Sequence, residues 1–276
     1  MLPERVIEII HEMKAERIRG ASWLAKRGAE AFLALAEELD EALLEDAIRE
    51  LRREIINVNP SMASLYNLAR FIPVTNKREL VRMRALEFLR RIEESKRELA
   101  NVGAQLIEER DVIITHSFSS AVLEIFRMAK ERRKSFKVIL TESSPDYEGI
   151  HLAKELEELS IDFEIITDAQ LGLFCRKATL AIVGADMVTK DGSVVNKAGT
   201  YLLALACHEN DVPFYVAAET YKFHPTLRAN EVTLMERDFE RGNFRVRNVL
   251  FDVTPWKFIR GIITELGIVI PPRDIQ

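Results

Sequence analysis

One stretch of the chain, residues 178–206, decides the fold: ATLAIVGADMVTKDGSVVNKAGTYLLALA. Its apolar beginning predicts a short buried strand, and its end carries the apolar side of a helix. Asp186 follows the strand directly, and Asn196 with Lys197 comes just before the helix. The stretch therefore predicts an acid at the carboxyl end of a strand and an Asn-Lys pair at the start of a helix.

This arrangement is typical of a ligand site. In open α/β sheets, the carboxyl ends of strands and the N-termini of helices converge on one crevice. The free N–H groups and the positive end of the helix dipole favour a phosphate there, and Lys197 adds a full charge. A purely structural interpretation stays open, because Asp191-Gly192 is an ordinary turn pair and Asn196 is a suitable helix cap.

Strand and helix patterns alternate on both sides of this stretch, from residue 111 onward. Apolar residues at helical spacing, as at 122–128 and 150–159, separate the strands. Repeated strand–helix units imply a mostly parallel sheet with helices on both faces and right-handed crossovers. The predicted strands lie at 112–115, 136–140, 163–166, 178–183 and 213–216, with late strands at 249–251 and 262–263.

The chain before residue 109 is helical almost throughout. Its apolar residues recur at helical spacing, and a long charge-rich segment has no Gly or Pro until Gly103. The sequence therefore predicts an α/β fold, with a helical N-terminal domain at 1–109 and a Rossmann-like domain at 110–276. The predicted helices cover 6–18, 24–35, 40–55, a segment opened by Pro60, and 77–110.

The composition excludes several classes of protein. With 47% apolar and 30% charged residues, the 276-residue chain can bury a core and stay soluble. The net charge of −5 gives no support for a nucleic-acid or membrane partner. No signal peptide or membrane span is visible, so we expect a cytoplasmic protein. Cys175 and Cys207 are too few for a disulfide framework, and we expect both to be small buried hydrophobic residues.

Motifs for nucleotides and metals are missing from the sequence. There is no GxxxxGK[ST] loop, and no GxGxxG follows the first predicted strand. The five histidines show no zinc-ligand spacing with the cysteines. We therefore expect neither a metal nor a cofactor, and no autonomous binding of GTP or a dinucleotide.

Several segments together resemble one superfamily. It joins the α, β and δ regulatory subunits of translation initiation factor 2B with isomerases of methylthioribose 1-phosphate and ribose 1,5-bisphosphate. The resemblance covers nearly the whole chain. The segments that carry it are IRGAS at 18–22, IITH at 113–116, TES at 141–143, the block 184–200, AETYKFHP at 218–225 and FDVTP at 251–255.

The isomerase branch uses a cysteine after the Thr-His pair, together with the aspartate of the Gly-Ala-Asp motif, as acid and base. The matching residues here are Ser117 and Asp186. A thiol titrates near ~8.5 and can carry a proton near neutrality. A serine needs a strong adjacent base, and His116 is its only suitable neighbour in the sequence. Ser117 therefore favours the non-catalytic branch, while an aldose–ketose isomerase remains the alternative.

Two further departures concern phosphate binding. Asn59 and Ser144 stand where the resemblance leads us to expect arginines. A lost charge-assisted hydrogen bond costs about 1.5–3 kcal/mol if nothing replaces it, which puts affinity for a bisphosphate in doubt. The remaining positions still form a plausible site for a phosphorylated sugar or a nucleotide. The resemblance places in it Arg19, Gly20, Ala21, Ser22, Asp186, Asn196, Lys197 and Lys222.

The resemblance also implies partners. A regulatory subunit of this kind contacts the GTPase translation initiation factor 2 and forms a homodimer or a higher homo-oligomer through its Rossmann-like domain. Apolar residues in 201–207, with the aromatic Tyr221, Phe223, Trp256 and Phe258, are candidates for that interface, although core packing explains them equally well. A ligand-sensing scaffold without the GTPase partner is a third interpretation.

Overall fold

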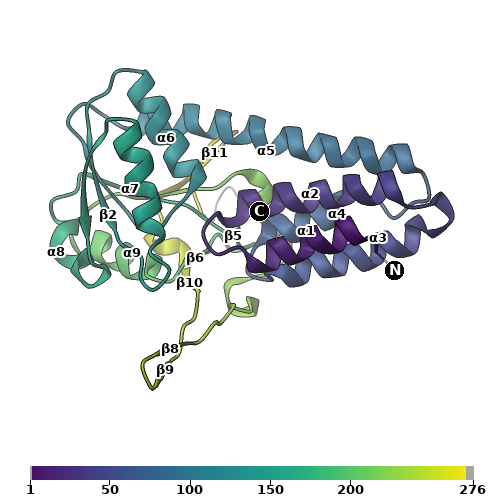
Figure 1. Ribbon diagram of the computed structural model, residues 1–276. Coiled ribbons are helices and arrows are strands. Elements are labelled where there is room, and N and C mark those ends of the chain that lie inside the picture. The colour runs from purple at the N-terminus through teal and green to yellow at the C-terminus, as the bar shows by residue number, and fades with distance from the viewer. Residues whose placement is uncertain (1, 272–276) are drawn as a thin grey trace.

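Five helices form the N-terminal part of the chain in the computed structural model, which describes residues 2–271 (Figure 1). Met1 and residues 272–276, which the two predicted domains include, lie outside the described part. Pro60 lies in the turn before the fourth helix. The helices are α1 (Glu4–Ala15), α2 (Gly20–Glu38), α3 (Glu41–Val58), α4 (Ala63–Phe71) and α5 (Arg78–Leu106).

The first helix ends earlier than predicted. Apolar side chains on one face of α1 are buried up to Met13, but the backbone turns extended at Glu16. The Glu16 carboxylate then accepts the N–H groups that follow it, which stabilises a loop instead of another helical turn. Ile18 therefore lies in the α1–α2 loop and not in the helix.

A seven-stranded sheet confirms the predicted α/β fold. Its strands are ordered β12-β11-β7-β4-β1-β2-β3, and every pair is parallel except β11 with the edge strand β12. The strands are β1 (Val112–Thr115), β2 (Lys137–Thr141), β3 (Asp162–Ile166), β4 (Leu180–Val183), β7 (Phe214–Ala217), β11 (Gly261–Thr264) and β12 (Gly267–Val269).

Helices cover both faces of this sheet, as the parallel topology requires. Ile113 packs with α6 (Ser120–Glu131), α7 (Glu148–Glu158) and the end of α5. Its neighbour Ile114 points to the other face and packs with α8 (Leu171–Cys175) and α9 (Thr200–Glu209). Cys175 and Cys207 are fully buried on that second face, as predicted.

A small antiparallel sheet, β10-β6-β5, corrects the prediction for the opening stretch. Asn196 and Lys197 lie in a strand, and α9 begins only at Thr200. The Asp191-Gly192 turn and the β-branched Val194-Val195 pair form a hairpin, which the later Phe251 strand completes. The strands of this sheet are β5 (Met187–Val188), β6 (Val194–Lys197) and β10 (Phe251–Thr254).

Two further features complete the described chain. The hairpin β8 (Phe239–Arg241) and β9 (Phe244–Val246) projects from the body of the molecule (Figure 1). Among residues 2–271, no helix has the length and apolar character needed to cross a membrane. Four short 3-10 helices in this part are η1 (Asp168–Gln170), η2 (Thr220–Lys222), η3 (Ala229–Glu231) and η4 (Trp256–Phe258).

Helix α5 belongs to both halves of the molecule. Its first part packs among the N-terminal helices through Phe88 and Ile92. Its last part packs against the sheet through Leu99 and Ala104. Figure 1 shows this helix running along both halves.

Candidate functional site

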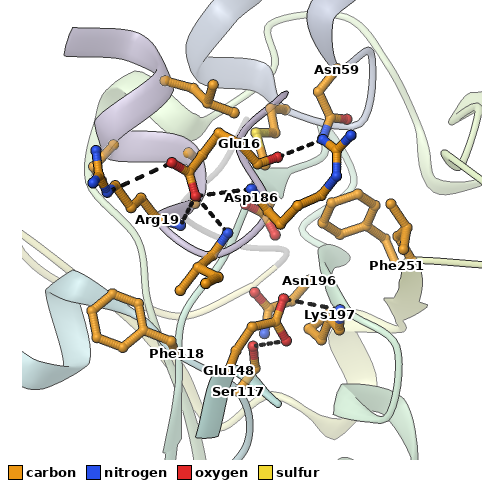
Figure 2. A pocket seen from close by; sticks show the side chains of 18 of the residues that line it. Glu16, Arg19, Asn59, Ser117, Phe118, Glu148, Asp186, Asn196, Lys197 and Phe251 are labelled. Carbon is orange, nitrogen blue, oxygen red and sulfur yellow. Dashed lines mark hydrogen bonds and ion pairs between the residues drawn. The ribbon is translucent and has the colours of Figure 1, made fainter. Parts of the chain in front are cut away.

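A pocket lies where the strand order of the large sheet reverses. β1 and β4 are neighbours, and the chain continues from β1 to β2 on one side and from β4 to β7 on the other. Ser117 follows β1 and Asp186 follows β4, so both reach the carboxyl edge at this switch point. Both residues line the pocket, together with the α1–α2 loop (Figure 2).

All eight residues predicted for the site line this one pocket: Arg19, Gly20, Ala21, Ser22, Asp186, Asn196, Lys197 and Lys222. They come from α2 and the loop before it, from the loop after β4, from β6 and from η2. The centre of a water molecule can move through about 100 Å³ of this space. That is room for several waters or one small polar molecule.

Among the described residues that line the pocket, Asp186 is the acidic residue whose carboxyl accepts no hydrogen bond. Its backbone is fixed, because its N–H donates to Val195 O (2.9 Å) and its carbonyl accepts from Ala63 N (3.1 Å). The residue is only 9% exposed. Burial raises the pKa of Asp186 to about 6, although Lys222 and Lys197 lower it. Asp186 is therefore an acceptor whose carboxyl is not used by the described chain.

The two lysines of the pocket already have carboxylate partners. Lys222 Nζ lies 2.8 Å from Glu219 Oε2, and both side chains are buried. Lys197 Nζ lies 3.1 Å from Asp146 Oδ2 and 3.0 Å from Glu148 Oε1. Neither lysine is an unpaired charge waiting for a ligand.

Ser117 is held by hydrogen bonds in a left-handed conformation with φ of 65°. Its N–H donates to Ser143 Oγ (2.8 Å), and its hydroxyl donates to Glu148 Oε2 (3.2 Å). Glu148 is 7% exposed, and burial raises the pKa of its carboxyl. The carboxylate that accepts from the Ser117 hydroxyl is therefore Glu148, which the sequence did not indicate.

His116, the neighbour in sequence, points away from Ser117. Its Nε2 lies 2.9 Å from the Ala198 carbonyl, so Nε2 carries the proton and donates it. Its Nδ1 then accepts from the hydroxyl of Thr141 at 2.7 Å. Burial also lowers the pKa of His116 and keeps the ring neutral. Both ring nitrogens are occupied by structural bonds, so His116 does not serve Ser117 as a base.

The loop before α2 contains its own anion. Glu16 Oε1 accepts the N–H groups of Arg17 (2.9 Å), Ile18 (2.7 Å) and Arg19 (3.0 Å). Burial raises the pKa of Glu16, but these bonds outweigh it and lower the pKa overall. The first N–H groups of α2, beginning at Gly20, have no partner within the helix, and Gly20, Ala21 and Ser22 line the same pocket. The start of α2 and the Arg19 side chain are therefore the groups at this end whose chemistry suits an anion.

The start of α9 is not available to a phosphate, contrary to prediction. The Asp252 carboxylate accepts the N–H of Gly199 (2.7 Å) and the N–H of Tyr201 (3.1 Å). Burial raises the pKa of Asp252 to about 6, although these two bonds lower it. A side chain of the protein thus takes the anion position at this helix. Asn196 does not cap α9 either; its amide donates to Thr200 Oγ1 at 2.9 Å from the adjacent strand.

The sequence profile of the initiation factor 2 subunit family matches residues 17–271. The chain belongs to this family. A translation initiation factor eIF-2B subunit 2-like protein of Pyrococcus abyssi is 82% identical, over 100% of both chains. The crystal structure of the Pyrococcus horikoshii OT3 translation initiation factor eIF-2B is 79% identical, with a TM-score of 0.99 over 100% of both chains. The ribose 1,5-bisphosphate isomerase of Archaeoglobus fulgidus is 36% identical, over 98% of this chain and 91% of the isomerase.

Membership of the initiation factor 2 subunit family confirms the resemblance inferred from the sequence motifs. The pocket also contains charged residues that this resemblance did not indicate. Arg17 Nη1 donates to the carbonyls of Lys14 (2.7 Å) and Glu16 (2.8 Å). Arg237 Nη1 lies 3.9 Å from Asp146 Oδ1. Arg237 enters from the base of the β8–β9 hairpin, far away in sequence, so no local signal could have placed it here.

Proposed function

We propose that this chain is a regulatory, non-catalytic subunit of the initiation factor 2B type. It binds the GTPase translation initiation factor 2 and retains a pocket for a phosphorylated sugar or a nucleotide. The observation that carries this proposal is the hydroxyl of Ser117, which donates to Glu148 while His116 is engaged elsewhere. A serine hydroxyl held by a carboxylate, with the neighbouring histidine engaged elsewhere, is a poorer proton carrier than a thiol, whereas all eight predicted site residues line the pocket.

The pocket suits a phosphorylated sugar in its division of polar groups. Asp186 and Asn196 offer oxygen and amide groups to hydroxyls in the middle of the pocket. The start of α2 offers N–H groups and the positive end of a helix dipole to a phosphate, with Arg19 beside it. Of the two ligand classes, these groups favour a sugar phosphate.

Binding and conversion are tested together by phosphorus and proton NMR on the purified protein with ribose 1,5-bisphosphate, and separately with methylthioribose 1-phosphate. We expect line broadening without a ketose product, and loss of the broadening in Asp186→Asn. Ser117→Cys is the informative companion, because it restores a thiol at the position where the isomerase pattern has its acid–base cysteine. Steady formation of ketose by the unmodified protein would contradict the non-catalytic proposal.

Contact with the GTPase is tested by co-sedimentation of the chain with initiation factor 2 at low salt. We expect a complex that persists in Ser117→Ala, because that change lies inside the pocket and leaves the surface intact. Absence of any association at low salt would contradict this part of the proposal. Ligand binding by NMR without a complex would instead support the scaffold interpretation.

The alternative, an aldose–ketose isomerase, is favoured by one observation. Asp186 has a pKa of about 6 in a buried pocket, which suits a group that takes up and returns a proton. In this case Glu148 takes the part of the second acid–base group. Ketose production that disappears in Asp186→Asn would establish this function in place of the first.

A homo-oligomer is part of the proposal, and the predicted interface residues now divide into two groups. Tyr221 is 2% exposed and belongs to the N-terminal core. Leu202 and Trp256 are 52% and 41% exposed, on neighbouring α9 and η4. We expect Leu202→Glu to reduce the mass measured by light scattering after gel filtration. Leu266→Glu is the matched control, because Leu266 is 83% exposed in the turn between β11 and β12.

A further inference from the structure

The pocket has two ends with different charge balance, separated by Asp186. Figure 2 shows Glu16 and Arg19 on one side of Asp186, and Ser117, Glu148 and Lys197 on the other. The first group belongs to the α1–α2 loop and the second to the carboxyl edge of the large sheet and to β6. We call them the α2 end and the inner end.

Cations at the inner end are matched by carboxylates. Lys197 is shared by Asp146 and Glu148 at 3.1 Å and 3.0 Å. Arg237 lies 3.9 Å from the second oxygen of Asp146. Two cations therefore face two carboxylates, and both lysine partners lie within hydrogen-bond distance. An additional phosphate here meets the buried Glu148 without an unpaired cation to offset the repulsion.

The α2 end has an excess of positive charge. Arg19 Nε lies 3.6 Å from Glu16 Oε2, and that carboxylate is also bound to three backbone N–H groups. Arg17 donates to backbone carbonyls, and no carboxylate in residues 2–271 forms an ion pair with it. The α2 end thus has two guanidinium groups and one carboxylate, which pairs with Arg19. The positive end of the α2 dipole adds to them.

The middle of the pocket accepts hydroxyls and repels anions. Asp186 is 9% exposed, and its carboxyl has no hydrogen-bond partner within the described chain. Lys222 lowers the pKa of Asp186 more than Lys197 does, and it is already paired with Glu219 at 2.8 Å. An unbonded buried carboxyl gains most from a neutral donor such as a sugar hydroxyl. A ligand therefore places its hydroxyls between the two ends.

From this charge pattern we infer that Glu148 is a specificity-determining residue, and that the pocket selects a pentose with one phosphate, bound at the α2 end, over a pentose bisphosphate. This inference rests on the proposed sugar-phosphate pocket and narrows its ligand. The negative charge of Glu148 repels the second phosphate directly. Glu148 also forms an ion pair with Lys197, so this lysine is not free to neutralise that phosphate. Selection of this kind works by an unfavourable contact with the rejected ligand.

The test is isothermal titration calorimetry of the full chain with ribose 1-phosphate, ribose 5-phosphate and ribose 1,5-bisphosphate. For the unmodified protein, we expect the better monophosphate to bind at least as tightly as the bisphosphate. In Glu148→Gln, the ratio of the two Kd values should shift at least tenfold toward the bisphosphate. This isosteric change removes the charge and releases Lys197 from one of its two partners.

Two further variants make the result specific. Asp146→Asn should shift the ratio in the same direction, because it also releases Lys197. Glu158→Gln makes the same chemical change at an exposed position of the same helix and should leave the ratio unchanged. Far-ultraviolet circular dichroism establishes that each variant is folded.

Three results would overturn the inference, and they have different meanings. Tighter binding of the bisphosphate by the unmodified protein contradicts the selectivity itself. A ratio that neither Glu148→Gln nor Asp146→Asn moves contradicts the role of Glu148, even if a monophosphate binds. Failure of all three sugars to bind contradicts the proposed sugar-phosphate pocket, and with it the inference that depends on it.

Discussion

Two aspartates, the half-buried Asp252 and the buried Asp186, lie on either side of β6 and have the same raised pKa. Burial raises both to about 6. Asp252 accepts two backbone N–H groups at the start of α9. Asp186 has no hydrogen-bond partner for its carboxyl within residues 2–271. The same raised pKa therefore occurs in Asp252, whose carboxylate completes the fold by capping α9, and in Asp186, whose carboxyl has unused acceptor capacity.

The comparison shows that a perturbed pKa alone does not identify a functional group. What separates the two aspartates is whether the surrounding backbone already uses the carboxylate. A carboxyl that caps a helix stabilises it, whereas a buried unbonded carboxyl costs stability unless a ligand donates to it. Substitutions at and around the two aspartates should distinguish these two roles.

The largest effect is expected from Gly199→Ala, at the residue whose N–H donates to Asp252. Gly199 has φ of +111°, and an added Cβ would lie 2.7 Å from His116 Nε2. Backbone strain together with this contact should lower the free energy of unfolding by about 4 kcal/mol. Gly172→Ala is the control, because an added Cβ there has open space. Chemical denaturation measures both, and equal stability of the two variants would contradict the packing described.

The second prediction concerns the pH dependence of the free energy of unfolding that the Asp186 carboxyl causes. A carboxyl whose pKa is raised from 3.8 to about 6 favours the folded state below pH 3.8, and that stability is lost as the pH rises through 6. The loss amounts to about 3 kcal/mol. Denaturation of Asp186→Asn and the unmodified protein between pH 4 and 8 should show their difference growing by this amount in favour of the variant.

The third prediction compares truncation of the two aspartates directly. Asp252→Ala leaves the N–H groups of Gly199 and Tyr201 without their acceptor and should cost about 2 kcal/mol at pH 7.5. Asp186→Ala breaks no hydrogen bond of the described chain and removes a buried carboxylate that is ionised at this pH, so it should leave the free energy of unfolding unchanged or raise it. Urea titrations measure the two values. A larger loss for Asp186→Ala would reverse the assignment of roles.

The smallest effect is expected at Ser117, which lies beside Asp186 at the same sheet edge. Its hydroxyl hydrogen is already donated to Glu148. Ser117→Ala should therefore change stability by less than about 1 kcal/mol, and the Kd for ribose 5-phosphate by less than about threefold. Calorimetry on the same samples checks both. Loss of binding in this variant would place the hydroxyl in contact with the ligand.

Much of the fold could be predicted from local pattern. β1 covers the predicted residues 112–115, because a short apolar run after a polar turn has few other interpretations. The sequence pattern predicts Asn196 and Lys197 at the start of a helix, whereas the structure has them in strand β6. This strand is stabilised by β10, which lies more than fifty residues later in the sequence. Long-range pairing of that kind leaves little local signal.

The sequence predicts which residues line the candidate site, but not how their charges are paired. Its eight residues sit in motifs that the sequence displays, and they do share one pocket. Glu148, Glu16 and Asp252 were missed because their roles depend on which N–H or hydroxyl lies within reach in three dimensions. Ion pairing decides which of the predicted cations remain available to a ligand, and the sequence does not contain that information.

Helix α5 ties the two halves of the molecule together mechanically. Phe88 and Leu99 lie in the same continuous helix but in different cores. Unfolding of α5 in one core would disturb the same helix in the other core and expose apolar surface there. The two halves should therefore unfold in one cooperative transition. A continuous α5 should therefore hold the two halves, which both contribute residues to the pocket, at a fixed spacing.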